Sequence, residues 1–369
     1  MKKISPIVKW WVTPMLPEHD IFVRHNPISQ WILHPIKRRI AKLYLELLQK
    51  YTDIKVIGIT GSAGKTTTKE MLVSILRLDG RTVYTSKNID SVYSIPNAIL
   101  KALPGTKYLV LEMGVEYPGE MDFYLWLAKP DVGIITNIFP THTEFLGSID
   151  GVFKEKSKLV LSLSEKGTAV LNSDDKKLKG LSKKLVSKIV WFDSDIDLIK
   201  QDANTASAAA EIFGVTEEKI NKGISNYKRP PHRLELIKHK SGALILDDSY
   251  NSNPWAALST LEYFNRIAKG RKIAVLGDML ELGDYDESAH RELGREVAES
   301  NFALVIGVGK SSKFLIDEIV RKSKKTKTYL FANVDEATLL FKDLLQKDTD
   351  ILIKGSRSIG LDKLIDALT

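Results

Sequence analysis

One stretch of the sequence combines residues that can hold the phosphates of a nucleotide. An apolar run, residues 56–60, leads directly into a loop that is followed by a helical pattern; the loop reads Gly61, Ser62, Ala63, Gly64, Lys65, Thr66, Thr67. Glycines let backbone N–H groups close around phosphate, the lysine adds positive charge, and a threonine hydroxyl can bind Mg²⁺. We therefore predict a site for ATP or GTP. The sequence departs from the longer P-loop pattern at Ile59, where that pattern has a further glycine. The alternative interpretation is a glycine-rich turn that binds no nucleotide.

Two polar side chains stand where neighbouring buried strands are predicted to end. Glu112 lies near the end of the apolar run 108–113, and His142 follows the run 132–137. Ligands bind at the carboxyl ends of the strands in an open α/β sheet. We therefore predict that Glu112 and His142 hold a second metal ion, since Mg²⁺ prefers oxygen ligands. The alternative for His142 is a hydrogen-bonded loop histidine.

Further motifs, taken together, resemble those of the Mur ligase family. Those of the central region are Gly61-Ser-Ala-Gly-Lys-Thr-Thr, Glu112-Met-Gly, His142-Thr-Glu-Phe-Leu-Gly-Ser and Lys154-Glu-Lys-Ser-Lys. Those of the C-terminal region are Asp247-Asp-Ser-Tyr-Asn-Ser-Asn-Pro, Val275-Leu-Gly-Asp-Met-Leu-Glu-Leu-Gly and Lys354-Gly-Ser-Arg-Ser. The resemblance extends over residues 54–369. Within the family, the C-terminal motifs look like those of the ligases that add D-Ala-D-Ala to a muramoyl-tripeptide.

The resemblance implies an ATP-dependent, ADP-forming ligase that joins a carboxylate to an amine through an acyl phosphate. The implied substrates are a muramoyl-peptide precursor of peptidoglycan and D-Ala-D-Ala, and the implied cofactors are ATP and two Mg²⁺ ions. The absence of cysteine fits a protein of the cytoplasm. Two alternatives stay open. One is a Mur-type ligase that joins another carboxylate and amine, as in cofactor modification or amino-acid polymerisation. The other is a non-catalytic ATP-binding subunit. Retention of the ligase motifs favours the first interpretation.

The resemblance also implies roles for the residues around the phosphate loop. Lys65 and the loop amides would hold the ATP phosphates, and Thr66 would bind one Mg²⁺. Glu112, His142 and a carbamylated Lys156 would bind the second ion. From the residues alone, Lys156 would be one exposed lysine beside Lys154 and Lys158.

Residues further along the chain match the family's nucleotide and substrate positions. The resemblance places Asn204 near the adenine, Arg233 at the phosphates and Asp248 near the ribose. From the residues alone, Asn204 is a helix cap and Asp248 belongs to a strand end and a helix cap. The resemblance assigns six residues to the side of the incoming amine: Tyr250, Asn251, Asn253, Lys354, Ser356 and Arg357. An arginine there suits a carboxylate, which its planar group binds bidentately.

Two successive alternations of strands and helices must position these residues. The first has apolar runs at 56–60, 108–113 and 132–137, with helical patterns from Thr66, Ile95 and Val152. The second has apolar runs at 243–246, 272–276, 303–306 and 351–353, after a stiff linker at 228–232. We expect an α/β fold. Residues 51–229 would form a P-loop ATPase domain with a mostly parallel sheet, and residues 230–369 a Rossmann-like domain.

Charge is concentrated at the start of the chain. Residues 1–50 contain nine lysines and arginines against three acidic residues, within a net charge of +8 for the whole sequence. The remainder is nearly neutral, which argues against a nucleic-acid-binding protein. A hydrophobic content of 43% without cysteine indicates a globular protein without disulfides. We predict neither a signal peptide nor a membrane-spanning helix.

Residues 1–50 read as a short basic segment, rich in tryptophan and proline, that ends in an amphipathic helix after Pro35. We predict an apolar face with Ile36, Ile40, Leu43, Tyr44, Leu47 and Leu48, opposite Lys37, Arg38, Lys42 and Lys50. That face would pack on the next domain; the alternative is a helix that rests on anionic lipid at the inner face of the membrane. The resembled ligases carry a domain for the UDP group here. We expect this segment to be too short for one. It would instead contact a nucleotide diphosphate, a lipid-linked precursor or another protein subunit.

Overall fold

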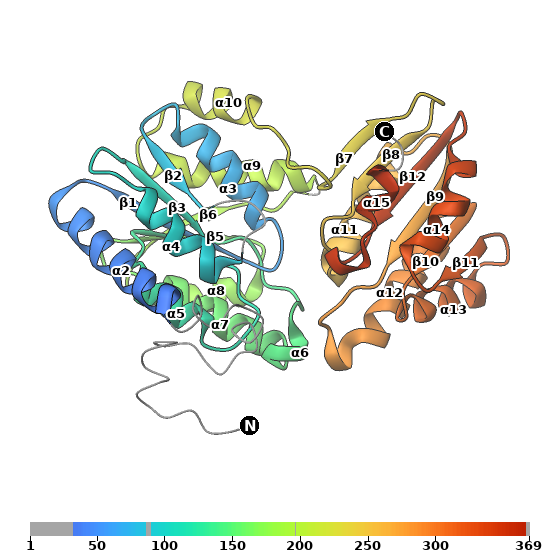
Figure 1. Cartoon of the computed structure of the whole chain (residues 1–369), viewed down its shortest axis with the longest axis horizontal. Helices are drawn as coiled ribbons and strands as arrows, with labels where there is room; N and C mark the ends of the chain where they lie inside the picture. Colours follow the sequence, from blue (N-terminus) through green and yellow to red (C-terminus); the bar gives the residue numbers. More distant parts are fainter. Residues whose placement is uncertain (1–31, 86–89, 196, 367–369) are drawn as a thin grey trace. The chain divides into compact units, whose positions relative to one another are not determined.

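The computed structural model describes residues 32–85, 90–195 and 197–366, which form two compact units (Figure 1). The first unit takes the chain up to Phe139 and again from Phe145 to Tyr227. The second takes Pro140–Glu144 and the chain from Lys228 onwards. Each unit has a six-stranded sheet with helices on both faces, so the predicted α/β class is confirmed.

The sheet of the first unit is parallel throughout, with strand order β2-β3-β1-β4-β5-β6. Its strands are β1 (Lys55–Thr60), β2 (Thr82–Tyr84), β3 (Tyr108–Glu112), β4 (Val132–Ile135), β5 (Thr168–Asn172) and β6 (Lys188–Phe192). The three strands predicted from apolar runs are β1, β3 and β4. They are neighbours, with β1 in the middle, because continuous apolar runs suit strands that are covered on both faces.

Helices cover both faces of this sheet. One core contains residues of α2 (His34–Tyr51), α4 (Ser91–Lys101), α5 (Glu120–Leu127), α7 (Ile149–Leu161) and α8 (Lys176–Ser182). The other contains residues of α3 (Lys65–Leu76), α9 (Leu198–Glu211) and α10 (Glu217–Ser225). A short helix, α6 (Thr143–Leu146), precedes α7. Asp90 and Ser148 cap α4 and α7 by accepting hydrogen bonds from backbone N–H groups, which explains where these predicted helices begin.

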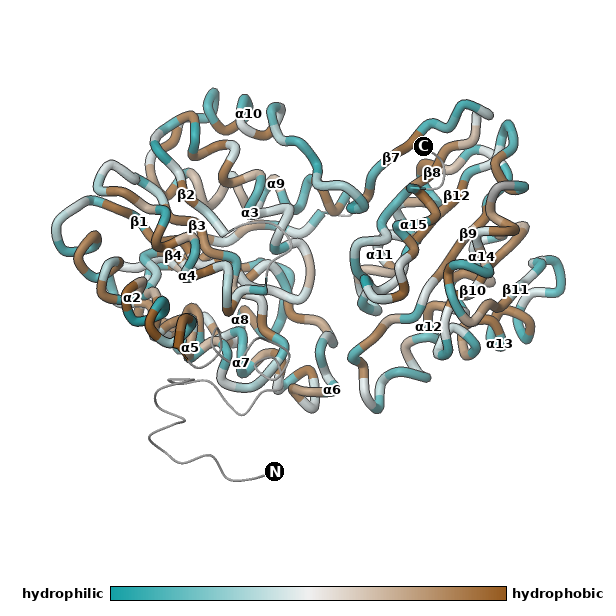
Figure 2. The backbone as a smooth tube through the Cα atoms, in the orientation of Figure 1, coloured by the Kyte–Doolittle hydropathy of each residue, from teal (hydrophilic) through white to brown (hydrophobic). Residues whose placement is uncertain are grey.

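The sheet of the second unit has the order β11-β10-β9-β12-β8-β7, and β7 is antiparallel to β8. Its strands are β7 (Glu235–Lys238), β8 (Leu244–Asp248), β9 (Arg271–Gly277), β10 (Leu304–Val308), β11 (Lys327–Phe331) and β12 (Thr349–Lys354). Its helices are α11 (Pro254–Ile267), α12 (Asp286–Glu299), α13 (Ser312–Lys322), α14 (Val334–Phe341) and α15 (Asp362–Asp366). The strands of both sheets carry much of the brown in Figure 2, as the predicted apolar runs require.

The predicted packing face of α2 is confirmed only in part: Leu48 is buried and Tyr44 packs against the core. Ile36, Ile40, Leu43 and Leu47 are exposed, whereas the face with Ala41, Leu45 and Leu48 enters the core. Arg38, predicted on the polar face, is buried, and its guanidinium lies 5.1 Å from the ring centroid of Phe123. Burial lowers the pKa of Arg38 to about 10. The prediction from apolar periodicity favoured the larger side chains. The side chains that pack beside α4 and α5 include Ala41 and Arg38 instead.

None of the helices in the described parts of the chain is both long and apolar enough to cross a membrane.

The close contact between α10 and α3 predicts the effect of one substitution. A Cβ atom on Gly223 would lie 2.5 Å from the Cα atom of Ile75, and a backbone atom cannot move aside easily. Gly223→Ala should therefore lower the free energy of unfolding by about 1–3 kcal/mol. The measurement is the urea midpoint followed by circular dichroism. Gly180→Ala in α8 is the matched control, because a Cβ there meets nothing within 4 Å; equal midpoints for both variants would refute the contact.

Candidate active site

The loop between β1 and α3 has no room for side chains at its two glycines. Gly61 has φ 151° and Gly64 has φ 77°, the second in the left-handed region that favours glycine. A Cβ atom would lie 1.9 Å from Thr136 Oγ1 at Gly61 and 2.4 Å from Asp202 Oδ1 at Gly64. The backbone of the loop is therefore held close to β4 and α9, with α3 beginning at Lys65. This is the strand–loop–helix geometry of a phosphate site.

Hydrogen bonds to the end of β4 fix the loop. The backbone N–H groups of Ser62 and Ala63 donate to Asn137 Oδ1 at 3.1 and 2.8 Å. Lys65 Nζ donates to the Gly61 carbonyl at 2.8 Å, so the lysine folds back over the loop. Sequence reasoning did not single out Asn137, although it closes the apolar run 132–137 that was predicted as a strand.

Two of the predicted metal ligands meet beside the loop. Thr66 Oγ1 donates to Glu112 Oε1 at 2.8 Å, and the other carboxylate oxygen lies 3.1 Å from Lys69 Nζ. Lys69 is buried, so its charge partly offsets that of Glu112. A hydroxyl and a carboxylate oxygen are donors of the kind that Mg²⁺ prefers, so the described side chains fit one such ion at this place.

Lys156 is fully buried in α7, so the interpretation as an exposed lysine is wrong. Its Nζ has no hydrogen-bond partner among the described residues. Burial, followed by the charge of Lys65, lowers the pKa of Lys156 well below its usual value, against the opposing effects of nearby carboxylates such as Glu120. Burial also raises the pKa of Glu120 to about 8. Burial therefore favours the neutral form of the Lys156 amine over the cation.

His142 is hydrogen-bonded within the second unit. Its Nδ1 lies 2.5 Å from Glu281 Oε2, and this contact lowers the pKa of Glu281. Both residues have left-handed backbones, with φ 53° and 64°, which is uncommon for residues other than glycine and frequent at functional sites. In the stretches that the structure covers, no three His, Asp or Glu side chains form a metal cluster. Metal binding by His142 stays a prediction; its partner Glu281 was missed, although it lies in the motif 275–283.

The second unit brings several predicted residues together where β8 and β12 end. Asp248 and Lys354 are register partners on these parallel strands, and Lys354 Nζ lies 2.6 Å from Asp248 Oδ2. The same nitrogen donates to the Asn251 carbonyl at 3.0 Å, and Thr260 also donates to Asp248. Lys354 is only 2% exposed, so removal of Asp248 would leave a buried charge without its partner.

Tyr250 brings two predicted arginines to one ring. The guanidinium carbon of Arg233 lies 3.8 Å from the ring centroid of Tyr250, and that of Arg357 lies 5.4 Å from it. Arg357 is more than half exposed and also pairs with Asp362 at 2.7 Å. Two guanidinium groups at one place can bind carboxylate or phosphate groups bidentately.

Three other predicted residues lie within a helix, at a helix cap and in a buried loop. Asn204 lies inside α9, whose cap is Asp197, so the interpretation as a helix cap is wrong. Asn253 caps α11 by accepting a hydrogen bond from the Ala256 N–H at 2.9 Å. Ser356 is buried, and its hydroxyl oxygen accepts a hydrogen bond from the Leu280 N–H at 2.9 Å. The last two side chains therefore order the loops that carry the predicted substrate residues.

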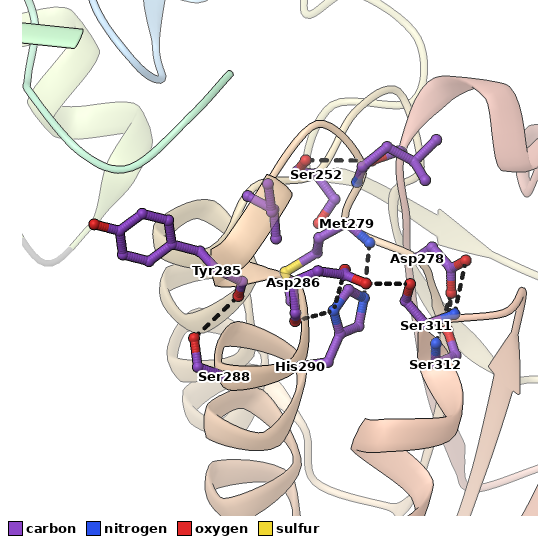
Figure 3. A network of polar contacts seen from close by, with 12 residues as sticks. Ser252, Asp278, Met279, Tyr285, Asp286, Ser288, His290, Ser311 and Ser312 are labelled. Carbon is purple, nitrogen blue, oxygen red and sulfur yellow. Dashed lines mark hydrogen bonds and ion pairs between the residues drawn. The ribbon is translucent and has the colours of Figure 1, made fainter. Parts of the chain in front are cut away.

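A polar network behind these loops was missed by sequence reasoning (Figure 3). Asp278, which follows β9, accepts hydrogen bonds from the N–H groups of Ser311 and Ser312 at 3.1 and 2.7 Å. Its carbonyl accepts one from the Ser356 N–H at 3.0 Å. His290 is fully buried and accepts a hydrogen bond from the Met279 N–H at 3.0 Å. The network therefore ties the loop after β12 to the turn after β9.

Comparisons with known proteins agree with this division into two units. The family model described as the Mur ligase middle domain matches residues 59–225, and the one described as Mur ligase, glutamate ligase domain matches residues 232–357. UDP-N-acetylmuramoyl-tripeptide–D-alanyl-D-alanine ligase of Bacillus subtilis is 30% identical, covering 90% of this chain and 78% of that protein.

Solved structures show the same fold. The crystal structure of MurF from Acinetobacter baumannii has a TM-score of 0.81 at 27% identity and covers 91% of this chain and 80% of its own. MurF ligase from Thermotoga maritima, in complex with ADP, has a TM-score of 0.79 at 24% identity, with 91% and 83% covered.

The Asp278 network predicts a loss of stability in one variant. Asp278→Ala leaves the N–H groups of Ser311 and Ser312 without their acceptor, and should cost about 2–4 kcal/mol of unfolding free energy. Urea unfolding followed by circular dichroism measures this. Asp317→Ala, at an exposed position of α13, is the control. Unchanged stability of Asp278→Ala would mean that water replaces the carboxylate.

Proposed function

Because the chain belongs to the Mur ligase family, we propose that it is an ATP-dependent, ADP-forming ligase of peptidoglycan synthesis. It adds D-Ala-D-Ala to a muramoyl-tripeptide precursor. The observation that carries this proposal is the relationship to the Bacillus subtilis ligase, which extends through both units and over 90% of the chain. The reaction consumes ATP, so we infer a cytoplasmic location.

The proposed reaction has two steps. A carboxylate oxygen of the precursor attacks the γ-phosphorus of ATP, and ADP leaves, which gives an acyl phosphate. The amine nitrogen of D-Ala-D-Ala then attacks the acyl carbon and loses a proton, and inorganic phosphate leaves. Negative charge builds up on the phosphoryl oxygens during the transfer, so cationic side chains and N–H donors at that place stabilise the transition state.

The phosphate loop would hold ATP, with Mg²⁺ beside it. The loop residues are Gly61, Ser62, Ala63, Gly64, Lys65, Thr66 and Thr67. The hydrogen bond from Lys65 Nζ to the Gly61 carbonyl keeps a positive charge at the loop. Thr66 and Glu112 would hold a magnesium ion, since their oxygens already lie 2.8 Å apart. When bound, Mg²⁺ neutralises phosphate charge and orients the transferred group. A second ion bound by Glu112, His142 and Lys156 stays part of the proposal.

A carbamylated Lys156 is supported by burial. The lone pair of a neutral amine can attack the carbon of CO₂ and release one proton, and burial lowers the pKa of Lys156, which favours the neutral amine. The product is an anion with oxygen donors, which suits a magnesium ion and the positive charge of Lys65. A buried lysine that stayed cationic would have to be paired, and its Nζ has no hydrogen-bond partner among the described residues.

The residues of the second unit would serve the nucleotide and the incoming dipeptide. We propose that Arg233 contacts the phosphates and Asp248 the ribose, with Asn204 of the first unit near the adenine. Tyr250, Asn251, Asn253, Lys354, Ser356 and Arg357 would line the dipeptide site. Arg357 is exposed enough to bind the dipeptide carboxylate, because its contact with Asp362 is a surface pair that a ligand can replace.

Two other functions are weaker. A Mur-type ligase for another carboxylate and amine keeps the same ATP site. The sequence identity to UDP-N-acetylmuramoyl-tripeptide–D-alanyl-D-alanine ligases speaks against it. A non-catalytic ATP-binding subunit would not need a buried lysine beside the phosphate loop. A contact of residues 1–50 with a membrane or a protein is a separate proposal, because none of the proposed catalytic residues lies there.

The first test is phosphate release from ATP with Mg²⁺, D-Ala-D-Ala and UDP-muramoyl-tripeptide, with each component omitted in turn. We expect release only when both organic substrates are present, and a pentapeptide product in the mass spectrum. Lys65→Ala is the negative control and should lose at least about a hundredfold in rate, as a transition-state contact does. ATP binding without release for this pair would assign the site to different substrates.

The second test concerns Lys156. Lys156→Ala should lose turnover and should regain part of it when formate or acetate is added, because a small carboxylate can occupy the place of the carbamate. Lys154→Ala is the matched control, since Lys154 is exposed on the same helix and should keep the normal rate. Full activity of Lys156→Ala without additive would disprove the carbamate.

A further inference from the structure

The helix α2 carries an apolar stripe on its exposed side. Ile36, Ile40, Leu43 and Leu47 are 41%, 52%, 60% and 54% exposed. Their spacing places them on one side of a helix. We call these four residues the α2 stripe. Ile32, Leu33 and Tyr51, at the two ends of the helix, are also exposed. Figure 2 shows the resulting alternation of brown and teal along α2.

The α2 stripe lies on the side of the helix that faces away from the core of the first unit. The opposite side of the helix, with Arg38, Ala41, Leu45 and Leu48, is the one that is buried. An α-helix of 18 residues is roughly 27 Å long. From Ile36 to Leu47 the α2 stripe runs along roughly 17 Å of the helix. Apolar side chains gathered on one exposed side mark a site of interaction, unlike those that are scattered singly.

Positive charge flanks the α2 stripe. Between Ile32 and Tyr51, Glu46 is the one acidic residue against four basic residues that are not buried. Lys37, Arg39 and Lys42 are half-buried, and Lys50 is exposed. Lys42 pairs with Glu46 and lies 5.6 Å from the ring centroid of Trp126. Lys101 and Lys129, at the ends of the neighbouring helices α4 and α5, are exposed as well. The surface around the stripe therefore suits an anionic partner.

We propose that the α2 stripe binds the surface of an anionic lipid membrane, with α2 lying in the plane of the interface. An apolar stripe bordered by lysine and arginine is the combination that partitions into the headgroup region. Residues 1–31 add four basic residues and three of the six tryptophans of the sequence, residue types that favour this interface. The proposal does not depend on the reaction, since the stripe contains no proposed catalytic residue.

The test is flotation of the full-length protein with vesicles. We expect binding to vesicles of phosphatidylglycerol and phosphatidylcholine, and about tenfold weaker binding to phosphatidylcholine alone, because several cationic side chains act near the surface. Raising the salt concentration to 1 M should weaken the binding to the anionic vesicles, since salt screens the attraction between charges.

Two variants separate the stripe from general surface effects. Leu43→Asp/Leu47→Asp should lower the vesicle partition coefficient at least about tenfold, because it places two carboxylates in the apolar face. Leu339→Asp is the matched control, because Leu339 is 82% exposed in α14 of the second unit. This variant should bind vesicles as strongly as the unsubstituted protein does. All three positions are exposed, so both proteins should keep the normal circular dichroism spectrum and melting temperature.

Three results would overturn the proposal. The first is an absence of binding to the anionic vesicles. The second is undiminished binding of the double variant, which would assign lipid binding to residues 1–31. The third is a dimer in light scattering that the double variant loses, without lipid binding, which would assign the stripe to a second copy of the chain.

Discussion

The position of β1 between β3 and β4 is the constraint on which the ATP half of the site depends. Parallel strands end at the same edge of a sheet, so the phosphate loop after β1, Glu112 at the end of β3 and Asn137 after β4 must meet there. Glycines at 61 and 64 let the loop backbone approach its neighbours closely enough for these contacts. The same crowding then brings Thr66 to Glu112 and places Lys65 over the loop.

In the second unit, too, adjacent parallel strands bring polar residues together at one edge of the sheet, and here these residues form an ion pair. Its adjacent strands β8 and β12 end in Asp248 and Lys354, which neutralise each other in a largely buried ion pair. That pair and the Asp278 network hold the backbone after each strand, while the longer Arg233 and Arg357 lie against Tyr250. Two arginines held at one ring are suited to binding small anionic groups, whose orientation decides whether an amine can attack.

Sequence patterns predicted what depends on short-range periodicity and on motifs. The strands β1, β3 and β4 and the phosphate loop were predicted because apolar runs and glycine spacing are local signals. The burial of Lys156 could not be predicted from its exposed-looking neighbours, because it depends on how α7 packs on the sheet. Asn137, Asp278 and Glu281 act through contacts with residues far away in the chain. The motif 275–283 marks Asp278 and Glu281, but no local pattern reveals their partners. The cap assigned to Asn204 failed because Asp197, a better cap, starts the helix earlier.

The orientation of α2 shows how one charged residue can override apolar periodicity. Arg38 lies over Phe123, and its charge acts on Asp90, a carboxyl group whose pKa is raised by burial. A rotation of α2 that buried Ile40 and Leu43 would remove Arg38 from both and leave the Asp90 carboxyl without that compensation. Burying an arginine while four aliphatic side chains stay in water is unfavourable by transfer free energy alone. The arrangement is consistent with a chain in which something other than water covers the outer face of α2.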